Sequence, residues 1–422
     1  MKNLAQQRIR AIVALVVFVT LGLTQLLSAY ASSILFVAPT GNDANSCLTM
    51  ASACQTIGAA VSKAFAGDTV IIATGVYTES IGIDKDLTLI GFGPDATIIN
   101  QGRIIVTTAT VRIYDMTIMH GGSIQDGGAL YNDRGDVTLT YVSVLSSHAE
   151  YDGGGIYNYQ GTLTLDNTIV VGNSAVKDAG GIYSYAGQVL LSHTIVQSNS
   201  ACNTACTNIP TRNPPGNKLD NGFLSFGGGI ENDAGIMIIE ASAIISNSSV
   251  SGGDGIYNAG TLVITNTTIS DNAGVAFGLQ NESVVIMTNV TLSGNKTNLR
   301  SISPSRAFLQ NTILANSSSG ANCFGSAIIS LGHNLSSDSS CNLIASGDLT
   351  NTNPLLGPLQ NNGGPTPTHA LLPGSPAINR GTNAGCPTTD QRGIARPQAG
   401  ICDIGAFEFV FPYSTYLPSV RR

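Results

Sequence analysis

Short apolar or β-branched runs, separated by Gly, Asn and Asp, recur along the chain after residue 66. Each run holds three to five residues rich in Val, Ile, Leu and Thr, which is typical of strands bounded by turns. No window of helical length in this region keeps the i, i+3, i+4, i+7 apolar spacing of an amphipathic helix. The pattern therefore predicts many short strands, for example within Thr162–Asn173, Gln188–Asn199 and Thr261–Asn272.

A glycine-rich box repeats along the same part of the chain. Its three best copies are spaced by 26 residues, and looser copies follow: Asp126–Asn132, Asp152–Asn158 and Asp178–Ser184, then Phe226–Asn232, Gly253–Asn258 and Phe277–Asn281. A fixed period in the twenties is the signature of a stacked solenoid. One such coil cannot bury its own apolar side chains, whereas stacked coils can. We therefore predict an all-β fold, a parallel β-helix of about ten to twelve coils.

Most repeat units end in an asparagine. These residues keep one register along the chain: Asn173, Asn199, Asn247, Asn272, Asn295 and Asn316. We expect them to form a hydrogen-bonded ladder between coils about 4.8 Å apart. Between the third box and the next copy the spacing widens to 48 residues. The surplus, 201–224, contains an Asn-Pro-Pro-Gly run and predicts a loop that leaves the coil.

The first residues have the composition of an export signal. Lys2, Arg8 and Arg10 precede an apolar run from Ala11 to Leu27, and Ala29-Tyr30-Ala31 offers small residues for cleavage. This pattern predicts a secretory signal peptide over 1–31. An uncleaved N-terminal anchor is the alternative. No later apolar run reaches the length of a membrane helix, so we expect no membrane span in the mature chain.

The eight cysteines also suggest an exported protein. An even count in such a chain indicates disulfides, and we favour pairing between sequence neighbours: Cys47 with Cys54, Cys202 with Cys206, Cys323 with Cys341, and Cys386 with Cys402. Metal binding at the Cys202 and Cys206 pair is the weaker alternative, because no further His or Cys lies at ligand spacing. The formal net charge of −7 argues against nucleic acid or an anionic membrane surface as partner.

The N-terminal part resembles the opening of a known superfamily. The resemblance rests on Phe36–Asp43, Cys54–Ala60, Ala66–Ile72, Gly75–Glu79 and Leu87–Gly93, and the superfamily is that of pectate-lyase-like parallel β-helices. It implies a right-handed, single-stranded parallel β-helix, here over 32–349, with a short capping helix at Gln55–Ala66.

The box around Tyr77 and Glu79 raises the question of an enzyme. A Gly-x-Tyr-x-Glu box also occurs in pectin methylesterases, but the later motifs that carry the catalytic aspartates of that family are missing from this chain. Polygalacturonase signatures are missing as well. We therefore expect Tyr77 and Glu79 to be structural.

Two further resemblances concern the repeats and the C-terminal part. Residues 126–316 are similar to the repeats of chlamydial polymorphic outer-membrane proteins, which implies a β-helical domain used in adhesion. The motifs within Asn353–Asn379, Asp390–Gly393, Arg396–Pro397 and Cys402–Glu408 resemble the choice-of-anchor Q domain of bacterial surface proteins. We expect 350–408 to close the C-terminal end of the solenoid and 409–422 to form a tail.

Three groups of residues are candidates for chemistry. The first is the aspartate column Asp126, Asp152 and Asp178, whose carboxylates could hold calcium or could be turn aspartates that bond their own backbone. The second is the tyrosine column Tyr131, Tyr157, Tyr183 and Tyr257, which could bind sugar rings. With 6% aromatic residues and no Trp, a structural ladder is favoured for it. The third is the only region rich in both signs of charge: Arg103, Arg112, Arg134, Asp115, Asp126, Asp133 and Asp136.

The favoured function is that of a non-catalytic secreted or cell-surface protein of a bacterium, acting in adhesion or glycan binding. Its expected partner is a polysaccharide or another cell-surface ligand, with calcium as the one possible cofactor and no catalytic residue assigned. The alternative is a polysaccharide lyase, esterase or epimerase. A lyase of this superfamily needs clustered carboxylates for calcium and a nearby Arg or Lys as base, which only the region rich in both charges could supply.

The calcium hypothesis has a direct test. If Asp126, Asp152 and Asp178 bind calcium, adding the ion raises the melting temperature and chelation lowers it, because a ligand that binds only the folded state stabilises that state. Thermal unfolding with and without a chelator measures this shift. An unchanged melting temperature on chelation would contradict the hypothesis.

Overall fold

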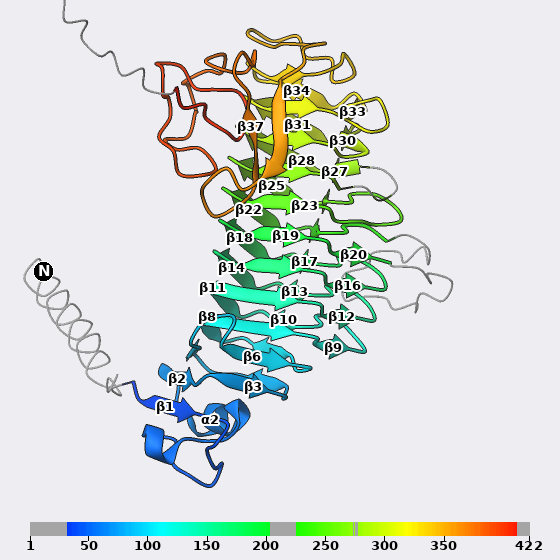
Figure 1. Cartoon of the computed structure of the whole chain (residues 1–422). Coiled ribbons are helices and arrows are strands. Elements are labelled where there is room, and N and C mark those ends of the chain that lie inside the picture. Colours follow the sequence, from blue (N-terminus) through cyan, green and yellow to red (C-terminus); the bar gives the residue numbers. More distant parts are fainter. Residues whose placement is uncertain (1–31, 203–224, 273, 275–276, 412–422) are drawn as a thin grey trace, which may run out of the picture.

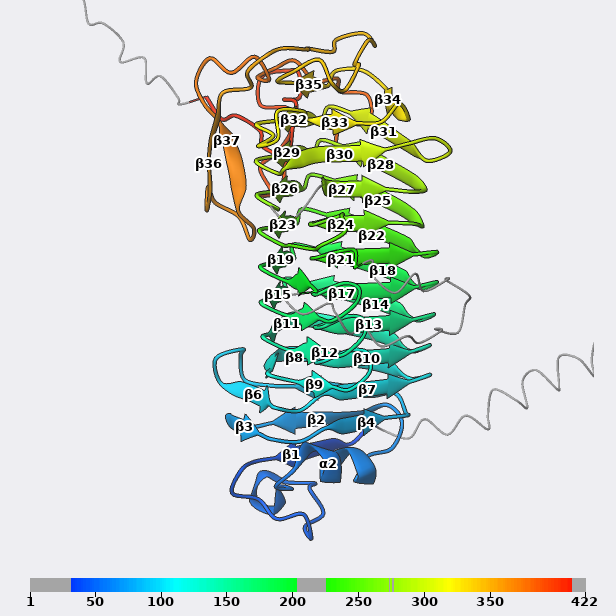
Figure 2. The same ribbon diagram turned by 90° about the vertical axis from the view of Figure 1, so that its right-hand side faces the viewer.

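The computed structural model describes residues 32–202, 225–272, 274 and 277–411. Within these ranges the chain is a right-handed parallel β-helix whose coils stack along one axis (Figures 1 and 2). The predicted fold class is therefore confirmed. Within the described ranges ten strands stack in one sheet and twelve in the first arm of another, in agreement with the ten to twelve coils expected. The predicted signal peptide, most of the loop at 201–224 and most of the tail lie outside the described residues.

Three sheets run the length of the solenoid or part of it, and we name them A, B and C. Sheet B has ten strands, namely β4 (Ile81–Ile83), β7 (Ile104–Thr107), β10 (Leu130–Asp133), β13 (Ile156–Tyr159), β17 (Ile182–Tyr185), β21 (Ile230–Asp233), β24 (Ile256–Asn258), β27 (Phe277–Asn281), β30 (Thr297–Ser301) and β33 (Cys323–Phe324). Sheet C has four strands, namely β9 (Gly122–Ser123), β12 (His148–Ala149), β16 (Ser174–Ala175) and β20 (Ser200–Ala201).

Sheet A is bent into two arms. The first arm contains β1 (Ile34–Val37), β2 (Asp68–Ile72), β5 (Leu87–Ile90), the first halves of β8 (Thr110–Met119) and β11 (Asp136–Leu145), β14 (Thr162–Asp166), β18 (Gln188–Ser192), β22 (Ile236–Glu240), β25 (Thr261–Thr265), β28 (Val284–Thr288), β31 (Arg306–Gln310) and β34 (Ile328–Ser330). The second arm contains β3 (Gly75–Tyr77), β6 (Thr97–Asn100), the remaining halves of β8 and β11, β15 (Ile169–Val171), β19 (Ile195–Gln197), β23 (Ala243–Ile245), β26 (Thr268–Ser270), β29 (Thr291–Ser293), β32 (Ile313–Ala315) and β35 (Leu335–Ser336).

One coil therefore runs from sheet B through the two arms of sheet A to sheet C. Within β14, Leu163 and Leu165 point inward and are fully buried, while the alternating threonines face outward, as the strand period of two requires. Residues such as Gln160 and Asn167 turn the corners in the left-handed region, at φ 51° and 48°. Many of these corners use residues other than glycine, because stacking compensates for their strain.

The predicted asparagine ladder lies inside the turn after the second arm. Each buried amide group donates a hydrogen bond of 3.0 Å to the amide oxygen of the next member, and the sequence of members is Asn173, Asn199, Asn247, Asn272 and Asn295. The same oxygens accept the backbone N–H of the preceding asparagine at 2.9 to 3.0 Å. Asn316 was expected to continue the ladder, and this was wrong. Its side chain is exposed, and the amide of Asn295 donates to Asn298 instead.

A helix covers the N-terminal end, as predicted, although α2 (Ile57–Lys63) is shorter than expected. The short 3-10 helix η1 (Met50–Ser52) precedes it. Both carboxylate oxygens of Glu79 accept the first backbone N–H groups of α2, those of Ile57 at 2.7 Å and Gly58 at 2.8 Å. The hydroxyl of Tyr77 donates to a backbone carbonyl, and burial raises its pKa to about 12. These contacts support the structural roles expected for Tyr77 and Glu79.

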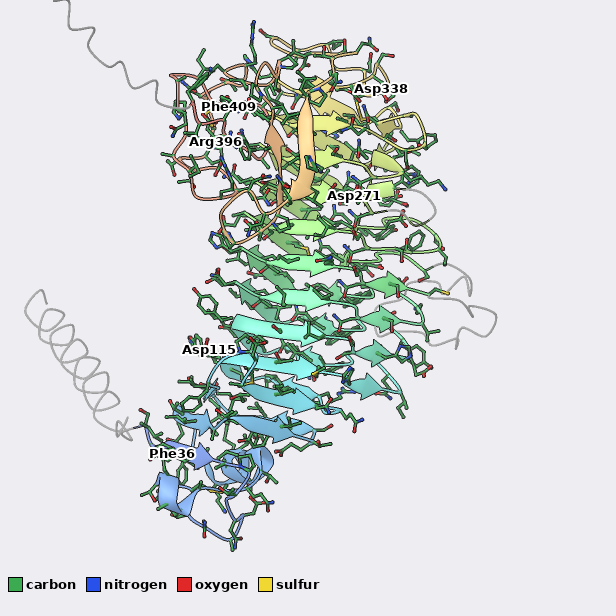
Figure 3. The ribbon with its side chains drawn as sticks, in the orientation of Figure 1. Phe36, Asp115, Asp271, Asp338, Arg396 and Phe409 are labelled. Carbon is green, nitrogen blue, oxygen red and sulfur yellow. A yellow bond between two sulfur atoms is a disulfide. The ribbon has the colours of Figure 1, made fainter. Side chains whose placement is uncertain are left out.

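The C-terminal segment was expected to close the end of the stack, but it lies along its side. Cys341 and Leu343 pack into the end of the core, whereas residues 353–411 lie against the second arm of sheet A (Figure 3). This segment includes the antiparallel pair β36 (Leu356–Gln360) and β37 (Thr368–Leu371). Its side-chain bonds reach down to coils far from the end, as in the contact of 2.7 Å between Gln391 and Thr268. A buried ion pair of 3.1 Å joins Arg396 and Glu408 inside it.

Three of the four predicted disulfides are present: Cys47–Cys54, Cys323–Cys341 and Cys386–Cys402. Cys202 is also disulfide-bonded, while Cys206 lies outside the described residues. In the described part of the chain, no helix is long and apolar enough to cross a membrane.

The ladder predicts a large effect of one substitution at its centre. Replacing Asn247 with Ala removes the acceptor of two Asn199 donors and the donor for Val196 O and Asn272 Oδ1. Because buried groups left unpaired cost about 1–3 kcal/mol each, we expect a loss of about 3 kcal/mol in unfolding free energy. Urea unfolding measures it.

The matched control is Asn316→Gly, since Asn316 has a φ of 55° that glycine adopts without strain. It should cost less than about 1 kcal/mol. Equal losses in the two variants would contradict the ladder.

Candidate functional site

Two tyrosine columns lie on the outer face of sheet B. The rings of Tyr131 and Tyr157 stack with centroids 5.3 Å apart, and those of Tyr157 and Tyr183 are 5.1 Å apart. A parallel column pairs Tyr159 with Tyr185 at 5.6 Å. Tyr157 is only 4% exposed, so stacking on neighbouring rings is its main contact. The structural ladder favoured from the sequence is therefore present.

Tyr257 occupies the expected column but does not extend the stack. Glu231 takes the tyrosine position in the intervening strand, between Tyr183 and Tyr257. The ring of Tyr257 stacks instead on Phe226 at 4.4 Å. The column of three adjacent tyrosines therefore ends at β17.

The aspartate column lies on the turns that lead into sheet B. The carboxylate of Asp126 accepts the backbone N–H of Asp152 at 3.3 Å, and that of Asp152 accepts the N–H of Asp178 at 3.2 Å. The carboxylate of Asp178 accepts the N–H of Phe226 at 2.9 Å. Each side chain thus ties its turn to the next coil, which is a structural role. All three aspartates are buried.

Burial and like charge change the acidity of the middle carboxyl. Burial is the larger cause that raises the pKa of Asp152 well above its ordinary value, and the neighbouring charge of Asp178 adds to it. Lys177 opposes this shift but does not reverse it. Lys177 is itself only 6% exposed. Burial and the neighbouring carboxyl therefore favour the neutral form of Asp152 up to a higher pH than for a free carboxyl.

An arginine lies at the other end of the row. The guanidinium carbon of Arg103 lies 5.7 Å from the centre of the Tyr131 ring, and its Nη1 donates to Ser123. Burial lowers the pKa of Arg103, while the charge of Asp126 acts in the opposite direction. Arg103 therefore lies near the Asp126 end of the row.

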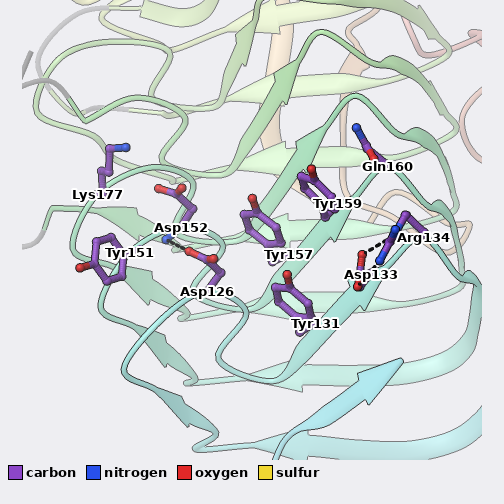
Figure 4. A pocket seen from close by; sticks show the side chains of 10 residues that line it. All are labelled: Asp126, Tyr131, Asp133, Arg134, Tyr151, Asp152, Tyr157, Tyr159, Gln160 and Lys177. Carbon is purple, nitrogen blue, oxygen red and sulfur yellow. Dashed lines mark hydrogen bonds and ion pairs between the residues drawn. The ribbon is translucent and has the colours of Figure 1, made fainter. Parts of the chain in front are cut away.

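Some members of these columns line a pocket of about 240 Å³ (Figure 4). Asp126, Asp152, Tyr151 and Lys177 form one side of it, and the tyrosines form its floor. The opposite side carries Gln160 and an ion pair of 2.8 Å between Arg134 and Asp133. The complete lining is Asp126, Tyr131, Asp133, Arg134, Tyr151, Asp152, Tyr157, Tyr159, Gln160 and Lys177.

The structure brings together only part of the charge-rich region identified in the sequence. Arg103, Arg134, Asp126 and Asp133 belong to the sheet B side. Arg112 and Asp136 lie on the outer face of the first arm of sheet A, and Asp115 turns the corner between its arms at φ 55°. A cluster of all seven residues does not form.

Sequence reasoning missed Tyr151, Tyr159, Gln160 and Lys177. Tyr151 directly precedes the aspartate of the second box, and Lys177 directly precedes that of the third. An alignment of the boxes that began one residue earlier would have shown that the residue type varies at this position, whereas the aspartate beside it does not. Tyr159 and Gln160 directly follow the asparagine of the second box. Their importance depends on a cavity, which the repeat pattern does not reveal.

The arrangement does not have the form of a calcium site. Calcium takes six to eight oxygen ligands, whereas an oxygen of each aspartate in the row accepts a backbone N–H group. Among the described residues, no group of three or more His, Cys, Asp or Glu is placed to hold a metal ion. Calcium binding at Asp126, Asp152 and Asp178 stays a prediction.

Several solved structures resemble this chain in fold. A structure of XylC in complex with xylose has a TM-score of 0.52 at 10% identity, covering 89% of this chain and 98% of that chain. Pectate lyase Pel9A has a TM-score of 0.47 at 15% identity, covering 90% of this chain and 98% of that chain. A rhamnogalacturonan lyase has a TM-score of 0.41 at 10% identity, covering 75% of this chain and 89% of that chain. No family model and no curated protein matches the chain.

The likeness to the XylC structure shows the β-helix fold alone. The resemblances to polymorphic outer-membrane proteins and to the choice-of-anchor Q domain stay predictions.

The raised pKa of Asp152 predicts a pH-dependent stability. A folded-state pKa above the ordinary value near 4 means that the folded state binds the proton more tightly, so this contribution is present at low pH and is lost as pH rises through the raised pKa. Asp152→Asn keeps a neutral group at this position. We expect the melting temperature of the variant minus that of the wild type to increase as pH rises from 4 to 8.

Thermal unfolding across this range measures the difference, with Asp133→Asn as the control in the exposed ion pair. A difference between Asp152→Asn and the wild type that does not change with pH would contradict a shifted carboxyl.

Proposed function

We propose that the chain is an exported bacterial protein that binds a glycan in the pocket on sheet B without cleaving it. The observation that carries the proposal is the lining of this pocket, where tyrosine rings meet carboxyl, amide and ammonium groups. Saccharides are bound by this combination, because ring faces pack on aromatic groups and hydroxyls exchange hydrogen bonds with polar ones. The three disulfides are consistent with an extracellular location.

The charges in the pocket favour a neutral saccharide. Arg134 is already paired with Asp133, and Lys177 lies beside the aspartate row. Both cations of the pocket lining therefore already lie beside a carboxyl group of the protein, which disfavours an ion pair with the carboxylates of a polyuronate. An anionic chain would also approach a protein of net charge −7. The xylose bound to XylC, a protein of the same fold, is such a neutral sugar.

The role of the aspartates supports binding over catalysis. Each of the three carboxylates holds the next coil through a backbone N–H group, so each has a structural role independent of any reaction. One observation favours the second candidate, a polysaccharide-active enzyme. A protonated Asp152 beside Lys177 would supply an acid next to a cation, and perturbed carboxyls concentrate at active sites.

Calorimetry with soluble oligosaccharides tests the proposal. The panel contains the hexamers of β-1,4-linked xylose, glucose and mannose, with a galacturonate oligomer as the anionic comparison. We expect a neutral hexamer to bind, and Tyr159→Ala and Lys177→Met to weaken it at least about tenfold, a loss of about 1.4 kcal/mol. The control is Tyr141→Ala, an exposed tyrosine at a corner of sheet A.

Failure of every saccharide to bind, or equal weakening by Tyr141→Ala, would contradict glycan binding in this pocket. New reducing or unsaturated ends released by the wild type, and lost in Asp152→Asn, would establish the second candidate instead.

A further inference from the structure

An apolar column runs along the outer face of the first arm of sheet A. Six successive strands, β18, β22, β25, β28, β31 and β34, stack along this arm (Figure 2). Each of them places one apolar side chain at the same register position. We call this column the apolar stripe, and its members are Leu190, Ile238, Val263, Ile286, Phe308 and Ile329.

Three of the six members of the stripe are exposed, and the other three, Leu190, Val263 and Phe308, are half-buried. Ile238 is 41% exposed, Ile286 is 37% exposed and Ile329 is 38% exposed, although a strand could place polar residues there at no cost. Ile236 lies beside the stripe on β22 and is 51% exposed. Contiguous exposed apolar surface of this kind marks interaction sites on soluble proteins.

The same column in the earlier coils shows that the fold does not require apolar residues there. Its members in β5, β8, β11 and β14 are Thr88, Arg112, Thr138 and Thr164. These strands have the same parallel pairing and the same buried inner face as the later ones. The change from polar to apolar at β18 therefore has no cause within the coil itself, and it indicates a contact with something outside the chain.

The stripe borders a surface that the protein already uses for packing. The C-terminal segment covers the second arm and bonds the corners next to the first arm, as Asn266 does to Thr389 O at 2.7 Å and Asn311 to Thr382 O at 2.9 Å. It stops at these corners and leaves the stripe open. A partner on the stripe would extend this existing interface.

The composition of the stripe excludes two kinds of occupant. Aliphatic side chains offer a sugar no hydrogen bonds and, apart from Phe308, no aromatic face. A membrane surface would call for basic and aromatic flanks. The two flanking columns together contain one acidic and one basic residue rather than a basic cluster. One column has Ser192, Glu240, Thr265, Thr288 and Gln310, and the other has Gln188, Ile236, Thr261, Val284 and Arg306.

We propose that the stripe is the contact surface for a second copy of this chain, packed sheet face to sheet face. Neighbouring members of the stripe are about 4.8 Å apart, the spacing of hydrogen-bonded strands, and only another sheet repeats at this distance. A second copy supplies the same stripe with the same repeat over six coils. Two such faces interdigitate with the sheets about 10 Å apart, and the contact closes as a symmetric dimer.

The size of the face sets the strength of the dimer. Six strands and three outward columns cover roughly 600 Å² on each copy, below the roughly 800 Å² per partner of a standard stable interface. We therefore expect a dimer that dissociates at micromolar concentration rather than an obligate one. This association is independent of the glycan pocket, which lies on sheet B.

Sedimentation velocity over a concentration series tests the proposal. The wild type should shift from monomer to dimer between about 1 and 100 μM. The double variant Ile238→Lys with Ile286→Lys should stay monomeric throughout, because paired stripes would bring buried like charges together. The matched control is Thr138→Lys with Thr164→Lys in the same column of the earlier coils. It should dimerise like the wild type, and Arg112 shows that the column accepts a long cation.

A charge exchange keeps the test independent of any loss of folding. The variant Ile238→Glu with Ile286→Glu should also be monomeric alone, and mixing it with the lysine variant should restore the dimer. A wild type that is monomeric at every concentration would overturn the proposal. So would a dimer that the stripe variants leave unchanged, or one that the threonine controls weaken equally.

Discussion

The hydrogen bonds between buried asparagine side chains fix the register on which the rest of this structure depends. In each of these turns the amide oxygen accepts both the backbone N–H and the side-chain amide of the preceding asparagine. Together with its own donation to a backbone carbonyl, one residue satisfies three buried polar groups of the neighbouring coil. Because a strand that slips by one residue turns its apolar side chains outward, this pairing also keeps the leucines and isoleucines of sheet A in the core. Register, burial and hydrogen bonding therefore support one another.

The same register builds the candidate site. Residues 26 positions apart in the sequence become neighbours about 4.8 Å apart, so a repeated tyrosine becomes a ring stack and a repeated aspartate becomes a row of carboxyls. The row costs stability through like charge and burial, and backbone N–H groups with Lys177 and Arg103 offset this cost. A pocket forms where the loops before sheet B stand above the tyrosines. Function in this fold depends on the residues that vary at fixed positions of the repeat.

The sequence was sufficient for the architecture because each coil obeys the same local rule. The period of 26, the alternating apolar residues and the recurring asparagines define the stack without knowledge of any other chain. The sequence did not predict the features that depend on which side chains lie next to one another in space. Asn316 keeps the spacing of the ladder, but Asn298 takes its place. Glu231 interrupts the tyrosine column at a degraded box.

The C-terminal segment and the pocket required the structure for the same reason. Gln391 and His369 bond to Thr268 and Ser270, residues about a hundred positions away, and no periodicity encodes such contacts. In the sequence Lys177 does not differ from other charged loop residues. Only the structure shows that it lines the pocket beside Asp152. The sequence contains the residues of the polar-to-apolar change along sheet A. Only the strand pairing shows that these residues lie in one column on the outer face of the sheet.

Hydrogen exchange of individual backbone amides tests the central claim most directly. The backbone N–H groups of Asn173, Asn199, Asn247 and Asn272 donate to side-chain oxygens of the next coil and to no carbonyl of a sheet. If the ladder holds the coils in register, these amides exchange as slowly as those of β15 and β19 beside them. Exchange at the rate of exposed turns would show that the asparagines do not form hydrogen bonds between coils. It would contradict the claim that the ladder fixes the register of the fold.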